Sequence, residues 1–85
     1  MTLLFEENTR AELRAFAPQA LVVLPVGATE QHGPHLPVGT DRFTAEYVAR
    51  AAAERASAQI PVLVAPTLPF GSSQHHLPFG GTLSL

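Results

Sequence analysis

The chain has 85 residues, enough for one small domain, and its 46% hydrophobic and 14% charged residues exclude an intrinsically disordered protein. Its net charge of -2 excludes the basic surface of a nucleic-acid-binding protein and the polybasic patch of a protein that binds anionic membranes. Because cysteine is absent, disulfides are excluded, and any metal must be held by oxygen and nitrogen ligands.

The N-terminal segment predicts a short helix and not a targeting sequence. Residues 1–8 lack the basic region of a secretory signal, and no apolar run approaches the roughly 20 residues that span a bilayer, so we expect a cytoplasmic protein. Thr9 and Glu12 form a Thr-x-x-Glu capping box, in which each side chain satisfies a free amide of the first turn. This box predicts a helix from Arg10 to Phe16, which Pro18 ends.

Two continuous apolar runs that flank a helix-forming segment predict a βαβ unit. The runs ALVVL (20–24) and IPVLVA (60–65) have strand length and no polar face, as is typical of parallel strands that are covered on both sides. Residues 42–57 are rich in Ala, Glu and Arg and predict a helix with Thr40 or Asp41 as its N-cap. The predicted buried stripe of this helix comprises Thr44, Tyr47, Val48, Ala51, Ala52 and Arg55.

The connections of this unit place all four histidines of the chain in two loops. The first loop follows the first strand, and the second loop, residues 67–81, follows the second strand. Because such crossovers are right-handed in nearly all proteins, and ligand sites of open α/β sheets gather at the carboxyl edge, we expect both loops to meet at that edge.

The first loop carries the residues of a candidate metal site. In an extended segment residues two apart point to the same side, so Glu30 and His32 can face one pocket while Gln31 faces away. Asp41, at a helix N-terminus, could bridge two ions that activate a shared water, which indicates hydrolysis. The spacing leaves alternatives open, because Asp41 could be a plain N-cap and His35 an ordinary loop histidine bonded to backbone.

The second loop offers weaker evidence. His75 and His76 are adjacent, so in an extended segment they would point in opposite directions and could not both serve one site. Ser72 and Ser73 lack the Gly-x-Ser-x-Gly elbow of serine hydrolases, and Gly80-Gly81 lacks the spacing of a dinucleotide fingerprint.

Two segments of the chain resemble a known family. PVGATEQHGPHLPVGTD (25–41) and GSSQHHLPFGGTLSL (71–85) resemble the N-terminal portion of the creatininase, or creatinine amidohydrolase, family. The resemblance runs from about Val22 to the last residue. It implies the βαβ unit of a three-layer α/β/α fold with a mainly parallel sheet, and an enzyme that uses divalent metal to cleave cyclic or linear amide C–N bonds.

The same resemblance implies a role for individual residues. Glu30 and His32 would bind different ions of a pair, while Asp41 would bridge them and His76 would line the site. Histidine together with carboxylates suits Zn or Mn, with Fe as an alternative. The second motif of relatives ends in Phe-Pro-Gly-Thr, where this chain has Gly80 in place of Pro, so a fixed φ is lost.

Family members are a few times longer, and their remaining ligands come from later segments. We therefore expect residues 1–85 to form a single partial domain that is inactive alone, while the complete protein acts on a small-molecule amide or peptide and is a homo-oligomer. The competing hypothesis is a non-catalytic truncated fragment or interaction module.

Overall fold

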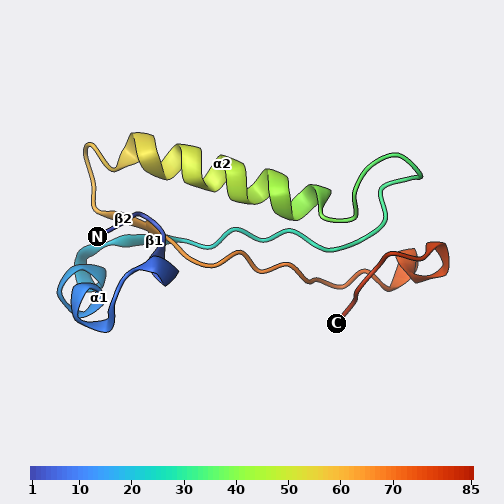
Figure 1. Cartoon of the computed structure of the whole chain (residues 1–85), viewed down its shortest axis with the longest axis horizontal. Helices are drawn as coiled ribbons and strands as arrows, with labels where there is room; N and C mark the ends of the chain where they lie inside the picture. The colour runs from blue at the N-terminus through green and yellow to red at the C-terminus, as the bar shows by residue number, and fades with distance from the viewer.

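The computed structural model describes all residues, 1–85, and shows a long helix lying along two parallel strands (Figure 1). The elements in chain order are α1 (Arg10–Phe16), β1 (Leu21–Val23), α2 (Thr40–Ala56) and β2 (Val62–Val64). Its radius of gyration is 15.5 Å, against about 12 Å for a compact domain of this length. The molecule is therefore elongated, with extents of 46 × 23 × 16 Å.

The two strands confirm the predicted βαβ unit and its α/β class. β1 pairs with β2 in parallel, with Leu21 opposite Val62 and Val23 opposite Val64. On its other side β2 meets the N-terminal segment, where the Val64 amide donates to the Leu3 carbonyl at 2.8 Å. All three residues of β2 are buried, whereas β1 lies at an edge and exposes Leu21. No helix has the length and apolar character needed to cross a membrane.

The face of α2 that meets the sheet differs from the predicted stripe. Ala49 and Ala53 are buried against Val62 and Val64, whereas Tyr47 is 76% exposed. The prediction was wrong because alanine occupies many positions of this helix, so its apolar periodicity contrasts little between faces. Small side chains allow the helix backbone to approach the strands closely. Other members of the predicted stripe, Thr44, Val48, Ala52 and Arg55, are exposed as well.

The start of α2 also differs from the prediction. Gly39 is its N-cap and makes no side-chain capping bond, so neither Thr40 nor Asp41 has that role. The Thr40 hydroxyl instead donates to the Pro37 carbonyl at 2.5 Å, and the Asp41 carboxylate lies beside His32. The helix begins at Thr40, and Asp41 is thereby placed in its first turn, near the positive end of the helix dipole.

The capping box of α1 forms as predicted. The Thr9 hydroxyl accepts from the Glu12 amide at 3.2 Å, and the Glu12 carboxylate accepts from the Thr9 amide at 3.1 Å. We expect Thr9→Ala to lower the free energy of unfolding by about 1 kcal/mol, because the amides of the first turn lose a partner. Urea denaturation followed by circular dichroism measures this loss.

Thr9→Ser is the matched control, because it keeps the accepting oxygen and should keep the stability. Equal stability of the Ala and Ser variants would show that the box contributes nothing. The bonds from Thr9 lower the pKa of Glu12 below its ordinary 4.5. The stability that the ionised Glu12 carboxylate contributes is therefore present above the unfolded-state pKa and is lost as pH falls through the folded pKa. The difference between the two variants should narrow in acid, while the bond from the Glu12 amide to the hydroxyl of residue 9 remains.

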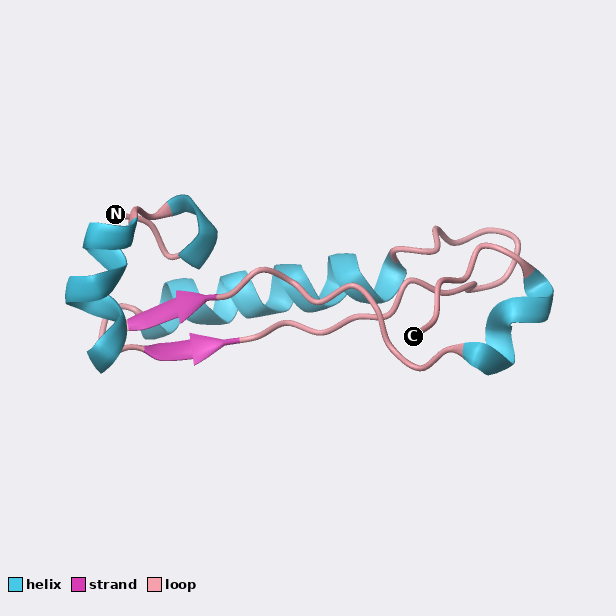
Figure 2. Ribbon diagram, turned by 90° about the horizontal axis from the view of Figure 1, so that it is seen from below, coloured by secondary structure: helices cyan, strands magenta, loops and turns pink.

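The two histidine-bearing loops continue the strand directions side by side, as predicted (Figure 2). The Gly27 amide donates to the Leu68 carbonyl at 3.0 Å, and the Thr29 hydroxyl donates to the Pro69 carbonyl at 2.6 Å. Farther along, the Leu83 amide donates to the Thr29 carbonyl at 2.9 Å. These bonds join the loops along their length and bring both histidine clusters to one end of the molecule.

Candidate metal centre

His32 and Asp41 form the first pair of the candidate site. The His32 Nε2 atom lies 3.1 Å from the Asp41 Oδ1 atom. His32 comes from the loop after β1, and Asp41 comes from the first turn of α2. The His32 side chain is 26% exposed and that of Asp41 is 44% exposed, so the pair is open to solvent and to a ligand.

The backbone fixes which nitrogen of His32 faces Asp41. Its Nδ1 atom lies 3.0 Å from the Glu30 carbonyl oxygen, which can only accept, so Nδ1 carries a proton. In the neutral ring Nε2 is then an unprotonated nitrogen directed at a carboxylate. Metal-binding histidines commonly show this arrangement, with one nitrogen donating to a carbonyl and the other left for the ion.

The surroundings of His32 favour a positive charge at this position. The pKa of His32 is raised above its ordinary 6.5, chiefly by the bond to the Glu30 carbonyl and further by the negative charges of Asp41 and Glu30, while burial opposes the shift. When no ion is bound, a proton on Nε2 of His32 can be donated to the Asp41 carboxylate. A divalent cation at the same place would replace that proton.

Glu30 takes part in a second pair. Its Oε2 atom lies 2.7 Å from the Nε2 atom of His76, and its side chain is only 16% exposed. His76 belongs to a short 3₁₀ helix, Gln74–Phe79, within the second loop. The predicted ligands Glu30, His32 and Asp41 therefore form two separate contacts. Glu30 contacts His76, whereas Asp41 contacts His32.

The 3₁₀ helix changes the expectation for the adjacent histidines. Because the segment is not extended, His75 and His76 do not point in opposite directions, and their ring centroids are 4.1 Å apart. Glu30, His75 and His76 each offer a ligand atom, and these atoms all lie within 4.8 Å of one another. His35, by contrast, is exposed and belongs to neither pair.

Gln31 links the two histidine-bearing loops, a role that its position in the sequence did not predict. It does not face away from the site, because its Nε2 atom lies 2.8 Å from the Nδ1 atom of His76. Residues 30–32 lie in a loop and not in a strand, and the chain turns at Gly33, which has a φ of 79°, so the alternation of an extended segment does not apply here. The backbone N–H of Gln31 also donates to the Thr82 hydroxyl at 3.0 Å, so both the side chain and the backbone of Gln31 bond to the second loop.

The second loop ends in a conformation that proline could not adopt. Gly80 has a φ of 79°, far from the roughly -65° to which proline is restricted, and its amide donates to the Leu77 carbonyl at 3.2 Å. The turn at Gly80 therefore requires a residue that can adopt a positive φ and that carries an amide N–H. The backbone of His76 is held at the start of this segment, where its amide donates to the Ser73 carbonyl at 2.9 Å.

The donor atoms present suit a divalent ion. The Nε2 nitrogen of His32, once it has lost its proton, and the carboxylates of Asp41 and Glu30 are the nitrogen and oxygen ligands that Zn²⁺, Mn²⁺ and Fe²⁺ accept. His32 and Asp41 already converge at 3.1 Å. That these three residues are the ligands remains a prediction.

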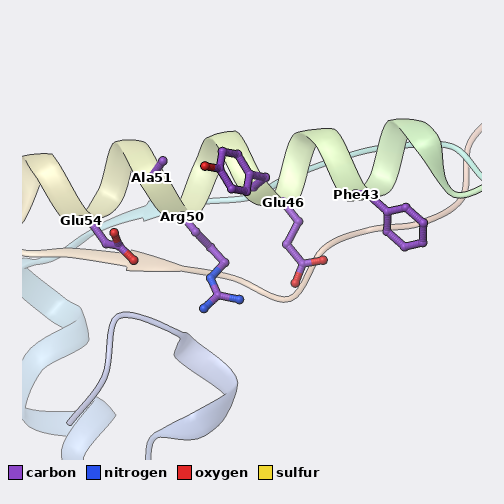
Figure 3. A pocket seen from close by; sticks show the side chains of 6 residues that line it. Phe43, Glu46, Arg50, Ala51 and Glu54 are labelled. Carbon is purple, nitrogen blue, oxygen red and sulfur yellow. The ribbon is translucent and has the colours of Figure 1, made fainter.

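A hollow on the exposed side of α2 is a separate feature. It encloses about 530 Å³ and is lined only by α2 residues, among them Phe43, Arg50 and Glu54 (Figure 3). None of its lining residues belongs to either histidine-bearing loop. The hollow is therefore not part of the candidate metal centre.

Comparison with known proteins places both loops in a wider context. The family model described as creatinine amidohydrolase matches residues 6–85. The chain is 44% identical over 80 residues to the mycofactocin precursor peptide peptidase of Mycolicibacterium smegmatis, covering 92% of this chain and 32% of that protein. It is 41% identical over 83 residues to the protein of the same name from Mycobacterium tuberculosis, covering 91% and 32% respectively.

Solved structures agree with this result. A manganese form of creatininase superposes with a TM-score of 0.85 at 35% identity, covering 100% of this chain and 34% of that one. A creatininase variant of Zn-Zn type gives a TM-score of 0.84 at 35% identity, with the same coverage. The chain thus spans about a third of the length of the relatives it matches.

Proposed function

Because this chain belongs to the creatininase family, we propose that it supplies part of the metal site of a metal-dependent amidohydrolase. The substrate would be an amide whose C–N bond is cleaved by water. In that reaction the water oxygen bonds to the carbonyl carbon, the C–N bond breaks, and the leaving nitrogen takes up a proton. A bound divalent ion would lower the pKa of the attacking water and polarise the carbonyl oxygen of the substrate.

The geometry of His32 carries this proposal. The Glu30 carbonyl accepts the Nδ1 proton at 3.0 Å, so Nε2 is the nitrogen left to bind an ion, and it is directed at the Asp41 carboxylate, 3.1 Å away. This arrangement selects a cation, and it requires His32 to be neutral when the ion binds.

We propose two ions and not one. Glu30 and His32 are directed at different partners, one toward His76 and the other toward Asp41. This separation supports their assignment to different ions, with the two oxygens of Asp41 shared between them. The Mn and Zn-Zn forms among the similar creatininase structures make these two metals the first to test.

The test is made in the whole protein that carries residues 1–85. We expect Glu30→Gln and Asp41→Asn each to lower metal content and to reduce amide hydrolysis more than about 100-fold, because even outer-shell partners contribute 10–100-fold. His35→Gln, a change in the same loop, is the control and should retain both properties. If both carboxylate variants keep their metal and activity, the assignment fails.

Among amides, a linear peptide is the favoured substrate. The peptide peptidases are 40–44% identical to this chain, whereas the creatininase structures are 34–35% identical. Parallel assays with a short peptide and with creatinine decide between the two classes. Faster turnover of creatinine would reject the peptide assignment while leaving the metal site intact.

A non-catalytic interaction module is the second candidate. The chain exposes large apolar side chains along β1 and α2, including Leu21 at 57% and Tyr47 at 76%, and buries only eight of 85 residues. Such surfaces are typical of protein contacts, including those of a homo-oligomer. If residues 1–85 alone hydrolyse amides when Zn²⁺ is added, this candidate is rejected.

A further inference from the structure

A chain of hydrogen bonds that crosses between the two loops ends on Glu30. Its first member is Gln31, whose Oε1 atom accepts from the Gly33 amide at 2.9 Å. A backbone N–H can only donate, so this bond fixes the orientation of the Gln31 amide group. The Nε2 atom of Gln31, which carries two protons, then lies 2.8 Å from the Nδ1 atom of His76.

This contact selects one tautomer of His76. An amide NH₂ group can only donate, so Nδ1 of His76 must accept and cannot carry a proton. The single ring proton therefore lies on Nε2, which is 2.7 Å from Oε2 of Glu30. In this tautomer Nε2 of His76 donates to the Glu30 carboxylate, and the His76 side chain is 26% exposed.

We propose that His76, held in this tautomer by Gln31, is a positioning residue that orients the Glu30 carboxylate for metal binding. The proposal rests on the proposed function, in which Glu30 is a ligand. The bond uses Oε2 and leaves Oε1 for the ion. Ligating carboxylates are commonly held by such outer-shell donors, whose removal costs about 10–100-fold in metal affinity.

Direct ligation is the competing arrangement. The ligand atoms of Glu30, His75 and His76 lie within 4.8 Å of one another and could surround one ion. That arrangement would have to displace the Nε2 proton of His76, because its Nδ1 atom already accepts from Gln31. The geometry thus favours His76 as a donor to Glu30.

Nitrogen-15 NMR of the imidazole rings in the metal-free chain tests the tautomer directly. We expect the ring proton of His76 on Nε2. In Gln31→Glu, which replaces the NH₂ group by an accepting oxygen of the same size, Nδ1 should also carry a proton, because a carboxylate then faces each ring nitrogen. A proton on Nδ1 in the unaltered chain would overturn the proposal.

Three variants test the effect on the metal, with Zn²⁺ alone as the probe and its dissociation constant as the readout. His76→Leu removes the donor and should weaken binding about 10–100-fold. His76→Gln places an amide N–H near the position of Nε2 and should recover most of that loss. His75→Leu, on the neighbouring residue, should bind as the unaltered chain does.

Two results would overturn the proposal, provided that circular dichroism shows the variants to be folded. One is unchanged Zn²⁺ affinity in His76→Leu. The other is equal loss in His75→Leu and His76→Leu without recovery in His76→Gln, which would make both histidines ligands. Glu30→Gln in the same assay tests the proposed function separately. If the Zn²⁺ affinity of Glu30→Gln is unchanged, Glu30 is not a ligand, whatever the His76 variants show.

Discussion

Gly27→Ala should destabilise the chain by about 3 kcal/mol and displace the first turn of α2. A Cβ atom at this position would lie 2.5 Å from the backbone nitrogen of Arg42 and 2.5 Å from the carbonyl carbon of Asp41. Backbone atoms cannot rotate away as a side chain can, so α2 or the loop must shift. Overpacking of this kind typically costs about 1–3 kcal/mol and occasionally more.

The same shift should reach the metal centre, because Asp41 lies at the point of contact. We expect weaker Zn²⁺ binding in Gly27→Ala as well as the lower stability, measured by urea denaturation and by titration. Gly71→Ala is the matched control, since its Cβ atom would meet only the Ala28 side chain at 3.8 Å. If both variants are equally stable, close approach of this loop to α2 does not hold the helix in place.

Local signals predicted the elements of the fold. The capping box and Pro18 gave the bounds of α1, because both act within a few residues of the helix ends. The apolar runs predicted both strands, although pairing is limited to three residues in each. The buried face of α2 escaped prediction, because Ala49 and Ala53 are selected by how closely the helix approaches β2 and not by their hydrophobicity.

The candidate site was predictable only in part. The two-residue spacing of Glu30 and His32 and the family resemblance predict these two residues and Asp41 as ligands, and the two loops meet as expected. The bond between Gln31 and His76 joins residues 45 positions apart, so no local pattern could reveal it. The bond also depends on the 3₁₀ conformation around His76, and a segment rich in proline and glycine does not predict this conformation.

His32→Gln should abolish most Zn²⁺ binding, with a loss greater than the roughly 100-fold upper range for outer-shell residues. In the unaltered chain the affinity should fall about tenfold for each pH unit below the folded pKa of His32, because the ion must displace a proton. Since that pKa is raised above 6.5, the fall should begin at a higher pH than for a free histidine. Titrations from pH 5 to pH 8 measure both effects.

The stability of the metal-free chain should change in the opposite direction. A raised folded pKa means that the protonated His32 contributes stability that is fully present below the unfolded pKa and is lost as pH rises through the folded pKa. Lowering the pH should therefore increase the stability that His32 contributes to the metal-free chain and decrease the affinity for Zn²⁺. A structural histidine that binds no ion would change only the stability. His35→Gln, which alters an exposed histidine of the same loop, should leave both pH profiles unchanged. If His32→Gln and His35→Gln bind Zn²⁺ equally well, the ion is held elsewhere.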